Sequence, residues 1–376
     1  MKRPPAIQMA DLYSQYLHIK SDVDSAIQSV IDSTLFIKGG KVSDFESSLS
    51  KYLDAHVISC GNGTDALQLA FMALELQPGD EVITTPFTFV ATAEVLALLG
   101  LKPLFCDTKP GTFTIDVSQI QALIGPRTKA ILPVHLFGQH ADMEEIMTIA
   151  RTNKLYVVED AAQSLGAEYR FSDGTQAPSG TMGEIGCTSF FPSKNLGAFG
   201  DGGALYTRNT LLAEKIRSIA NHGMKVRYHY DRIGINSRLD SLQAAVLDVK
   251  LPHLPGYIAS RQAAADWYDQ HLGNIDGLKI PERNPNSTHT FHQYTLLTPL
   301  RDALMQHLKV MGIPSMIYYP KPLHMQEAYS YLGYSEGDFP NAEIQAQQVL
   351  SLPMHTELSE EQLSYITDSI QKFFGR

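Results

Sequence analysis

The stretch HVISCGNGTDALQLAFMAL, residues 56–74, passes from a short apolar run through a glycine-containing turn into a helical pattern. Val57–Cys60 is rich in residues that favour β-structure. After Asp65 the apolar side chains recur at the spacing of one helix face. The stretch therefore predicts a strand, a tight turn and a helix over Asp65–Leu76.

The same alternation of strand and helix continues to residue 207. Further β-rich runs are Glu81–Thr85, Lys102–Asp107, Lys129–Val134, Tyr156–Glu159, Cys187–Phe191 and Ala204–Thr207. Further helical patterns are Thr92–Leu99, Val117–Ile124, Asp142–Asn153 and Thr210–Asn221. This alternation predicts an α/β fold with a mostly parallel sheet covered on both faces. Ligands of such sheets gather at the carboxyl ends of the strands.

A second region follows the predicted helix Arg238–Leu251, since Pro252 and Pro255 favour a break there. We expect a large domain over residues 1–251 and a smaller α+β domain over 252–376. The predicted elements of the second region are a helix from Gly256, a strand at His292–Thr298, a helix at Arg301–Val310, a strand at Ser315–Tyr319, and helices after Asn341 and Ser359.

The composition excludes several classes of protein. The chain has 376 residues and a net charge of -10, which argues against a nucleic-acid partner. No stretch has the roughly 18 continuous apolar residues of a membrane helix, and the N-terminus does not resemble a signal peptide. The three cysteines are widely spaced, which favours reduced thiols in the cytoplasm. The histidines show no metal-ligand spacing, so we expect no metal site.

The turn from Cys60 to Asp65 is the first candidate binding element. Backbone N–H groups of Gly63, Thr64 and Asp65 at a helix N-terminus can hold a phosphate. A plain helix cap is the alternative. A dinucleotide fingerprint is a third possibility, but its third glycine is missing.

Two later motifs complete a pattern. Asp160 ends an apolar strand, where its carboxylate can meet a cationic ring nitrogen, and Gln163 lies one turn further on. Lys194 stands in an aromatic, glycine-rich setting with few charges, where desolvation favours a nucleophilic amine. Ser189 offers a hydroxyl to a phosphate. Each motif alone also has a structural explanation, as a cap or a buried lysine. Together they match the needs of pyridoxal 5'-phosphate (PLP).

Through these motifs the chain resembles the DegT/StrS family of PLP-dependent sugar-nucleotide aminotransferases, of the aspartate-aminotransferase fold type (fold type I). The stretches Phe190–Lys194 and Asn236–Asp240 carry the resemblance most specifically. It implies a seven-stranded large domain and a smaller C-terminal domain. It also implies a homodimer with a shared active site.

The resemblance assigns a role to each residue. Lys194 would be the catalytic lysine that holds PLP as a Schiff base, with pyridoxamine 5'-phosphate as the second cofactor form. Cofactor contacts would come from Gly63, Thr64, Asp65, Phe89, Asp160, Gln163, Ser189 and, across the dimer, Asn236. Substrate contacts would come from Arg238, Tyr319 and His324. Many relatives have histidine at the position of Tyr318, so substrate contacts there are in doubt.

The pattern is most similar to enzymes that aminate UDP-2-acetamido-2-deoxy-3-oxo-glucuronate for surface-polysaccharide (lipopolysaccharide) sugars. L-Glutamate would be the amino donor. The basic stretch Lys225–Arg232 suits an anionic substrate, although a solvated basic loop explains it equally. Alternatives are a 4-keto-6-deoxy sugar nucleotide as substrate, and a non-catalytic PLP-binding regulator. Dehydratase relatives replace the lysine with histidine, so Lys194 favours transamination.

Overall fold

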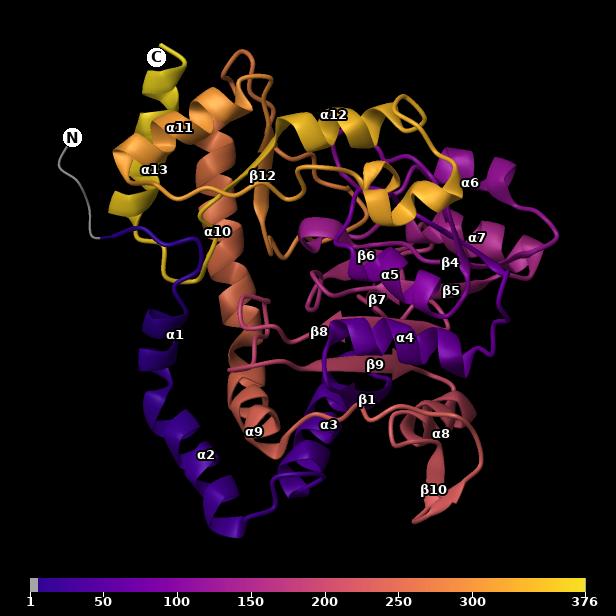
Figure 1. The fold of residues 1–376 in the computed structure, drawn as a ribbon. Helices are drawn as coiled ribbons and strands as arrows, with labels where there is room; N and C mark the ends of the chain where they lie inside the picture. The colour runs from indigo at the N-terminus through magenta and orange to yellow at the C-terminus, as the bar shows by residue number, and fades with distance from the viewer. Residues whose placement is uncertain (1–5, 376) are drawn as a thin grey trace.

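The computed structural model describes residues 6–375, built around a central seven-stranded sheet (Figure 1). The strand order is β1-β9-β8-β5-β4-β2-β3, and β9 alone runs antiparallel to its neighbours. The strands are β1 (His56–Cys60), β2 (Glu81–Thr84), β3 (Lys102–Phe105), β4 (Thr128–Ile131), β5 (Tyr156–Asp160), β8 (Ile185–Ser189) and β9 (Gly203–Thr207).

Helices cover both faces of this sheet because successive strand residues point to opposite sides. Val158 packs beneath one helix layer and its neighbour Val157 beneath the other. The first layer contains α4 (Gly63–Ala73), α5 (Ala91–Leu98) and α8 (Thr210–Ile219). The second contains α3 (Gly40–Leu53), α6 (Val117–Leu123), α7 (Met143–Asn153) and α9 (Ser241–Lys250).

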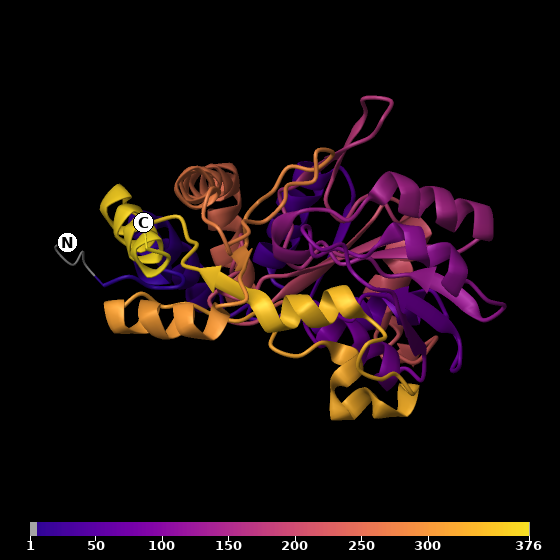
Figure 2. The same ribbon diagram turned by 90° about the horizontal axis from the view of Figure 1, so that it is seen from above.

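The C-terminal part packs beside the sheet on a core of its own (Figure 2). The long helix α10 (Leu254–Leu272) runs along both regions and follows α9 through a 3-10 turn at Leu251–His253. The other elements are β12 (Tyr294–Leu297), α11 (Arg301–Met311), α12 (Pro340–Gln348), β13 (Val349–Leu352) and α13 (Glu360–Phe373). At the N-terminus, α1 (Leu12–His18) and α2 (Lys20–Ser33) precede α3. Further 3-10 turns are Leu136–Gly138, Leu323–Met325 and Glu327–Leu332.

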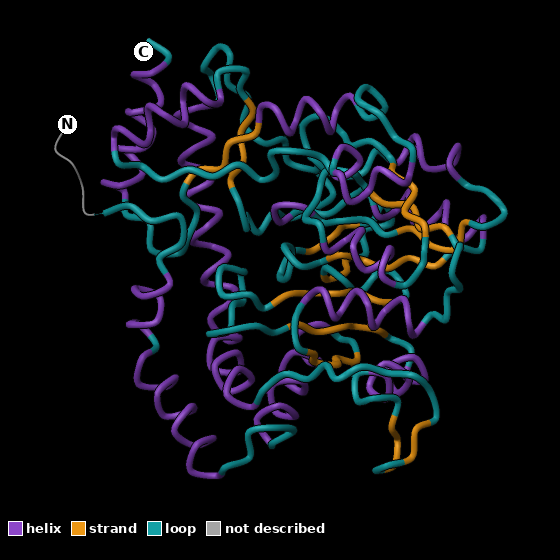
Figure 3. The backbone as a smooth tube through the Cα atoms, viewed as in Figure 1, coloured by secondary structure: helices purple, strands orange, loops and turns teal. Residues whose placement is uncertain are grey.

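The predicted α/β fold with its mostly parallel seven-stranded sheet is confirmed. One predicted strand is wrong: Ser315–Tyr319 forms only a single bridge, between Met316 and Ser351, and then continues as a loop (Figure 3). Tyr318 and Tyr319 are partly buried and line a cavity, whereas Met316 is exposed. The division into residues 1–251 and 252–376 stays a prediction.

Two small hairpins were not predicted. They are β6 (Glu168–Arg170) with β7 (Gln176–Pro178), and β10 (Met224–Val226) with β11 (His229–Tyr230). The second hairpin contains much of the basic stretch Lys225–Arg232 and projects from the body of the protein (Figure 1). No helix within residues 6–375 is both long and apolar enough to cross a membrane.

Candidate active site

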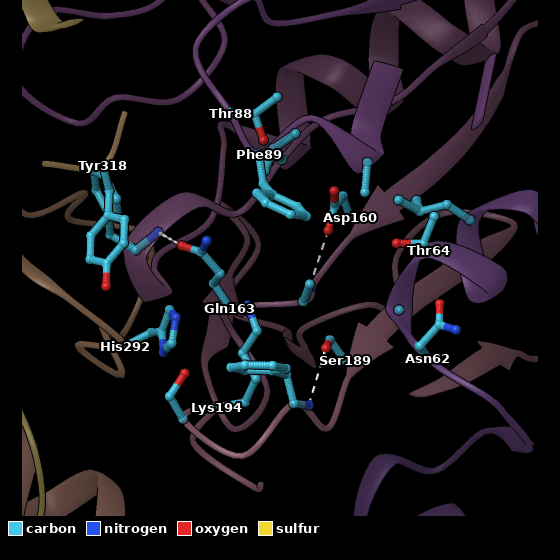
Figure 4. Close-up of a pocket in the computed structure, with 18 of the residues that line it drawn as sticks. Asn62, Thr64, Thr88, Phe89, Asp160, Gln163, Ser189, Lys194, His292 and Tyr318 are labelled. Atoms are coloured by element: carbon cyan, nitrogen blue, oxygen red, sulfur yellow. Dashed lines mark hydrogen bonds between the residues drawn. The ribbon is translucent and has the colours of Figure 1, made fainter. Parts of the chain in front are cut away.

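A cavity of about 610 Å³ opens at the carboxyl ends of β1, β5 and β8 (Figure 4). One wall comes from strand ends and loops before residue 202, and the other from residues 292–319. The predicted residues that line it are Gly63, Thr64, Asp65, Phe89, Asp160, Gln163, Ser189, Lys194 and Tyr319. The fold therefore brings most of the predicted site into one space.

The N-terminus of α4 forms one end of the cavity. The Asn62 side chain caps this helix by accepting a hydrogen bond from the Asp65 N–H over 2.8 Å. Gly63 and Thr64 begin the helix, where N–H groups lack intrahelical partners. A Cβ on Gly63 would lie 2.7 Å from the Cβ of Ser189, so only glycine permits this close approach. The N–H groups, the Thr64 hydroxyl and Ser189 together form a cradle suited to a phosphate.

Asp65 contributes to this end in a different way from that expected. Its backbone N–H donates a hydrogen bond to the Asn62 side chain, which caps α4. Its carboxylate accepts a hydrogen bond from the Ser237 hydroxyl over 2.6 Å, and Ser237 also accepts the Gly61 N–H. Asp65 thus ties the turn to the segment around Ser237.

Asp160 ends β5 and is buried beneath the cavity floor. Its Oδ2 accepts a hydrogen bond from the Thr92 hydroxyl over 2.8 Å, and its Oδ1 accepts the Ala162 N–H. The Thr88 and Thr92 hydroxyl oxygens lie 3.1 Å apart, within hydrogen-bond distance. Because Thr88 holds the Thr92 hydroxyl in place, the Asp160 carboxylate that accepts from Thr92 has a fixed direction. Burial raises the pKa of Asp160. A cationic ring nitrogen in the cavity would favour the ionised carboxylate.

Lys194 lies opposite, on the loop after β8, and its side chain faces the cavity (Figure 4). Desolvation lowers the pKa of Lys194 to about 8, although the charge of Asp160 acts in the other direction. A lysine with this lowered pKa has a larger neutral fraction near physiological pH than an exposed lysine, although the charged form still predominates. The amine is therefore able to act as a nucleophile or to accept a proton.

Gln163 and Tyr319 join the two walls. The Gln163 Oε1 accepts the Phe137 N–H over 2.7 Å, which leaves its Nε2 to donate to the Tyr319 hydroxyl over 3.3 Å. The rings of Phe89 and Tyr319 lie 6.2 Å apart, centroid to centroid. Phe89 is half exposed and presents an aromatic face at the cavity.

This set of groups fits PLP. The α4 cradle matches the phosphate, Asp160 matches the ring nitrogen, Phe89 matches the ring face and Lys194 matches the aldehyde. The buried imidazole of His292 also lines the cavity, and its Nδ1 has no hydrogen-bond partner among the residues that the structure describes.

The remaining predicted residues lie outside this cavity. Asn236 is exposed and forms a backbone bridge with Asn221. Arg238 lines a second pocket of about 390 Å³ together with Lys38 and Arg217. His324 is buried, with its Nε2 3.0 Å from a Glu343 carboxylate oxygen. In a single chain, none of these three side chains reaches the cavity.

Sequence reasoning missed Asn62, Thr88, Thr92 and His292. A signal existed for the two threonines: they follow β2 at a spacing of four residues, at the carboxyl edge where ligands gather. Asn62 stands at a helix cap position, where asparagine is favoured. His292 gives no local signal, because its place in the cavity depends on the packing of the C-terminal part.

Comparisons with known proteins show the family of the chain. Residues 18–371 match the profile of the DegT/DnrJ/EryC1/StrS aminotransferase family. A protein named pleiotropic regulatory protein, from Geobacillus stearothermophilus, is 46% identical over 98% of each chain. A UDP-N-acetyl-3-dehydro-alpha-D-glucosamine 3-aminotransferase of Acidithiobacillus ferrooxidans is 43% identical over 99% of each chain. A UDP-2-acetamido-2-deoxy-3-oxo-D-glucuronate aminotransferase of Pseudomonas aeruginosa is 44% identical over 96% of this chain and 98% of its own.

Solved structures give the same result. The crystal structure of a DegT/DnrJ/EryC1/StrS aminotransferase from Brucella abortus matches with a TM-score of 0.93 and 41% identity, over 98% of this chain and 100% of that one. A Bacillus subtilis protein with bound pyridoxamine 5'-phosphate matches with a TM-score of 0.90 and 30% identity, over 100% of this chain and 86% of that one. The chain therefore belongs to the DegT/DnrJ/EryC1/StrS aminotransferase family, whose aminotransferases use PLP.

Proposed function

We propose that this PLP-dependent aminotransferase moves an amino group from L-glutamate to the 3-keto group of a UDP-sugar, in the supply of sugars for surface polysaccharides. The observation that carries the proposal is the single cavity in which Lys194, Asp160 and the α4 cradle meet. A lysine, a carboxylate and a phosphate cradle in this arrangement support amino-group transfer.

We assign the following roles to the chain's own residues. Gly63, Thr64 and Ser189 hold the phosphate, and Asp160 holds the ring nitrogen in its protonated form. When bound, PLP supplies an aldehyde that takes up the amino group and a ring that withdraws electrons from the adjacent carbon. Lys194 is the base that would remove the proton from the donor's α-carbon and deliver it to the former aldehyde carbon of the cofactor.

The 3-keto UDP-sugar is favoured by two relatives. The Acidithiobacillus and Pseudomonas enzymes, 43% and 44% identical to this chain, are both named for 3-oxo or 3-dehydro UDP-sugars. Their named substrates differ in that one is a glucosamine and the other a glucuronate. We propose the glucuronate as substrate, because the basic stretch Lys225–Arg232 and the Arg238 pocket suit an additional carboxylate.

Each half of the reaction can be tested by spectroscopy. The yellow, PLP-loaded protein is treated with L-glutamate, freed of amino acid, and then given 3-oxo glucuronate, 3-oxo glucosamine or 4-oxo-6-deoxy nucleotide sugars separately. Bleaching followed by return of the yellow colour with the 3-oxo glucuronate alone is the expected result. Return only with a 4-oxo sugar would keep the mechanism and reject the substrate. A protein that glutamate does not bleach has another donor or no aminotransferase activity.

We further propose that the enzyme is a homodimer in which Asn236 and Arg238 serve the cavity of the second copy. Two observations support this arrangement. The first is that both residues lie outside the cavity of their own chain. The Arg238 guanidinium makes no hydrogen bond or ion pair within residues 6–375, so it is available to an anionic ligand.

Mixed dimers test this arrangement. A Lys194→Ala chain and an Arg238→Ala chain are inactive separately. If Arg238 acts across the interface, a mixed dimer regains one complete site, because the intact Lys194 of one chain meets the intact Arg238 of the other. If Arg238 acts within its own chain, mixing restores nothing.

A regulatory role is the second candidate, since the relative at 46% identity is named a pleiotropic regulatory protein. A regulator that only binds PLP would show the yellow colour but no bleaching by any amino acid. For location, we propose the cytoplasm, where nucleotide sugars are made. All three cysteines are buried and unpaired, which agrees with a reducing compartment.

A further inference from the structure

The loop Phe191–Phe199, here termed the lysine loop, holds Lys194 between β8 and β9. Two hydrogen bonds shape its base. The Lys194 N–H donates to the Phe191 carbonyl over 2.8 Å, and the Ala198 N–H donates to the Phe190 carbonyl over 2.8 Å. Both bonds stay within the loop and its entry, so they fix its fold without fixing its position against the rest of the protein.

Leu196 and Ala198 pack the loop against the apolar core that it shares with α3 and α9, but the loop's polar side chains add no hydrogen bond within residues 6–375. Asn195 is only 5% exposed, yet neither atom of its amide has a hydrogen-bond partner among the described residues. At Gly197 the backbone turns back so closely that a Cβ would lie 2.1 Å from the Pro192 carbonyl oxygen. The loop is thus tightly folded and depends on a neighbouring element for its place.

Helix α9 provides the anchors from outside the loop. The Nζ of Lys250, in its last turn, donates to the Gly197 carbonyl over 2.6 Å. The Oε1 of Gln243, in its first turn, accepts the Phe199 N–H over 2.8 Å. The Lys250 ammonium also lies 5.8 Å from the centre of the Phe199 ring. Lys250 is therefore bound to the part of the loop that follows Lys194.

Burial of the Lys250 ammonium lowers the stability of the fold. It is 3% exposed, and no carboxylate forms an ion pair with it in the part of the chain that the structure describes. Burial, with a contribution from Arg261, lowers the pKa of Lys250 to about 8. A buried ammonium without a counter-charge destabilises a fold, whereas an apolar side chain of the same length would pack without that cost. Packing alone does not explain a lysine here.

We propose that Lys250 is a positioning residue, which sets the place of Lys194 through the Gly197 carbonyl and so tunes how Lys194 holds the cofactor. The inference rests on the proposed role of Lys194 as the cofactor lysine. Gly197 is three residues from Lys194 within a tightly folded loop. Loss of the ammonium leaves the Gly197 carbonyl without this donor and removes one of the two hydrogen bonds between the loop and α9, which changes the surroundings of the Lys194 amine.

The test compares four variants: Lys250→Met, Lys250→Gln, Lys250→Arg and, as a control, Lys51→Met. The Gln side chain ends one atom short of the Nζ position, and Arg keeps a charged donor. Lys51 is an exposed lysine in the last turn of α3, the helix that packs against α9. Two quantities are measured: the Kd of the cofactor-free protein for PLP, and the pH midpoint of the absorbance change of the PLP-loaded protein.

The Met and Gln variants are expected to bind PLP at least tenfold more weakly and to shift the pH midpoint by half a unit or more. The Arg variant should stay within threefold of the wild-type Kd, and Lys51→Met should match the wild type. A folded Met or Gln variant with wild-type Kd and midpoint overturns the proposal. Loss of folding in both also overturns it, in favour of a lysine that only supports the fold.

The proposed role of Lys194 is tested separately. If Lys194 is not the cofactor lysine, borohydride reduction still fixes PLP covalently to the site of the Lys194→Ala protein. That result would refute the proposed function whatever the Lys250 variants do. If borohydride fixes PLP to Lys194 of the wild type and not to the Lys194→Ala protein, while the Lys250 variants behave as wild type, only the positioning role fails.

Discussion

The Thr92 hydroxyl donates a hydrogen bond to the Asp160 carboxylate over 2.8 Å, and both side chains are buried beneath the cavity. This hydrogen bond orients the Asp160 carboxylate toward the position proposed for the ring nitrogen. Replacement by valine keeps the shape but removes the donor. A lost hydrogen bond to a buried charged group costs about 1.5–3 kcal/mol.

Thr92→Val is therefore expected to slow the half-reaction with L-glutamate by roughly tenfold or more. Stopped-flow measurement of bleaching at saturating glutamate gives the rate. Thr92→Ser, which keeps the hydroxyl, is the matched control and should retain most of the wild-type bleaching rate. Equal rates for the two variants would show that Thr92 does not orient Asp160.

The pKa of Lys194, lowered from the ordinary 10.5 to about 8, predicts a pH profile for PLP uptake by the cofactor-free protein. Only the neutral amine attacks the aldehyde, and its fraction grows as pH rises toward the pKa. The rate of colour formation should thus reach half of its maximum near pH 8 and level off about one pH unit above it. Initial rates between pH 6 and 10 give the midpoint.

For this profile, Lys194→Ala supplies the background of PLP that reacts with other lysines, and its contribution is subtracted. A corrected rate that continues to climb through pH 10 would show that Lys194 keeps the pKa of an exposed lysine.

Gly63→Ala tests the phosphate cradle. The added Cβ would lie 2.7 Å from the Ser189 Cβ and 3.3 Å from its hydroxyl oxygen, so the two sides of the cradle must separate. The Kd for PLP should increase at least tenfold, which corresponds to about 1.4 kcal/mol. Fluorescence titration of the cofactor-free protein measures it.

Gly40→Ala is the matched control for the cradle, because Gly40 begins α3 and a Cβ there would meet no atom within 4 Å. It should leave the affinity for PLP unchanged. If both glycine variants bind PLP like the wild type, the phosphate lies elsewhere.

Arg261 in α10 is expected to stabilise the C-terminal part of the protein. This guanidinium is 4% exposed, and its Nη1 donates to the carbonyl oxygens of Phe291, His292 and Met354 over 3.1, 3.4 and 2.9 Å. Arg261→Met leaves these buried carbonyls without their charged donor. The free energy of unfolding should decrease by about 2–5 kcal/mol, as measured by urea unfolding without cofactor.

The comparison for Arg261 is Arg283→Met. Arg283 pairs with Asp266 and Asp269 near the surface, where an ion pair contributes only about 0–1 kcal/mol. Similar losses in the two variants would contradict the special role of Arg261.

The sequence was sufficient for the sheet and for much of the cofactor site because both depend on local patterns. Strand runs such as Val57–Cys60 and the helix after Asp65 have clear periodicity, and parallel strands place their carboxyl ends at one edge. Asp160, Ser189 and Lys194 each follow or end such a strand. Their meeting in one cavity follows from the topology alone.

The sequence was insufficient where position depends on distant packing. Ser315–Tyr319 has the composition of a strand, but the neighbouring edge offers it only Ser351 as a partner. His292 enters the cavity because Arg261, distant in sequence, holds its backbone. The roles proposed for Asn236 and Arg238 involve a second chain, and local sequence patterns do not describe contacts between chains.

The cavity draws its two walls from different stretches of the chain, one before residue 202 and the other from residues 292–319. Substitutions that reshape the C-terminal wall leave the phosphate cradle, Asp160 and Lys194 untouched. Inheritance of the cofactor groups and inheritance of this wall are thus separable along the gene. A lineage with this architecture can vary the C-terminal wall of its cavity by changing a short stretch, without rebuilding its catalyst.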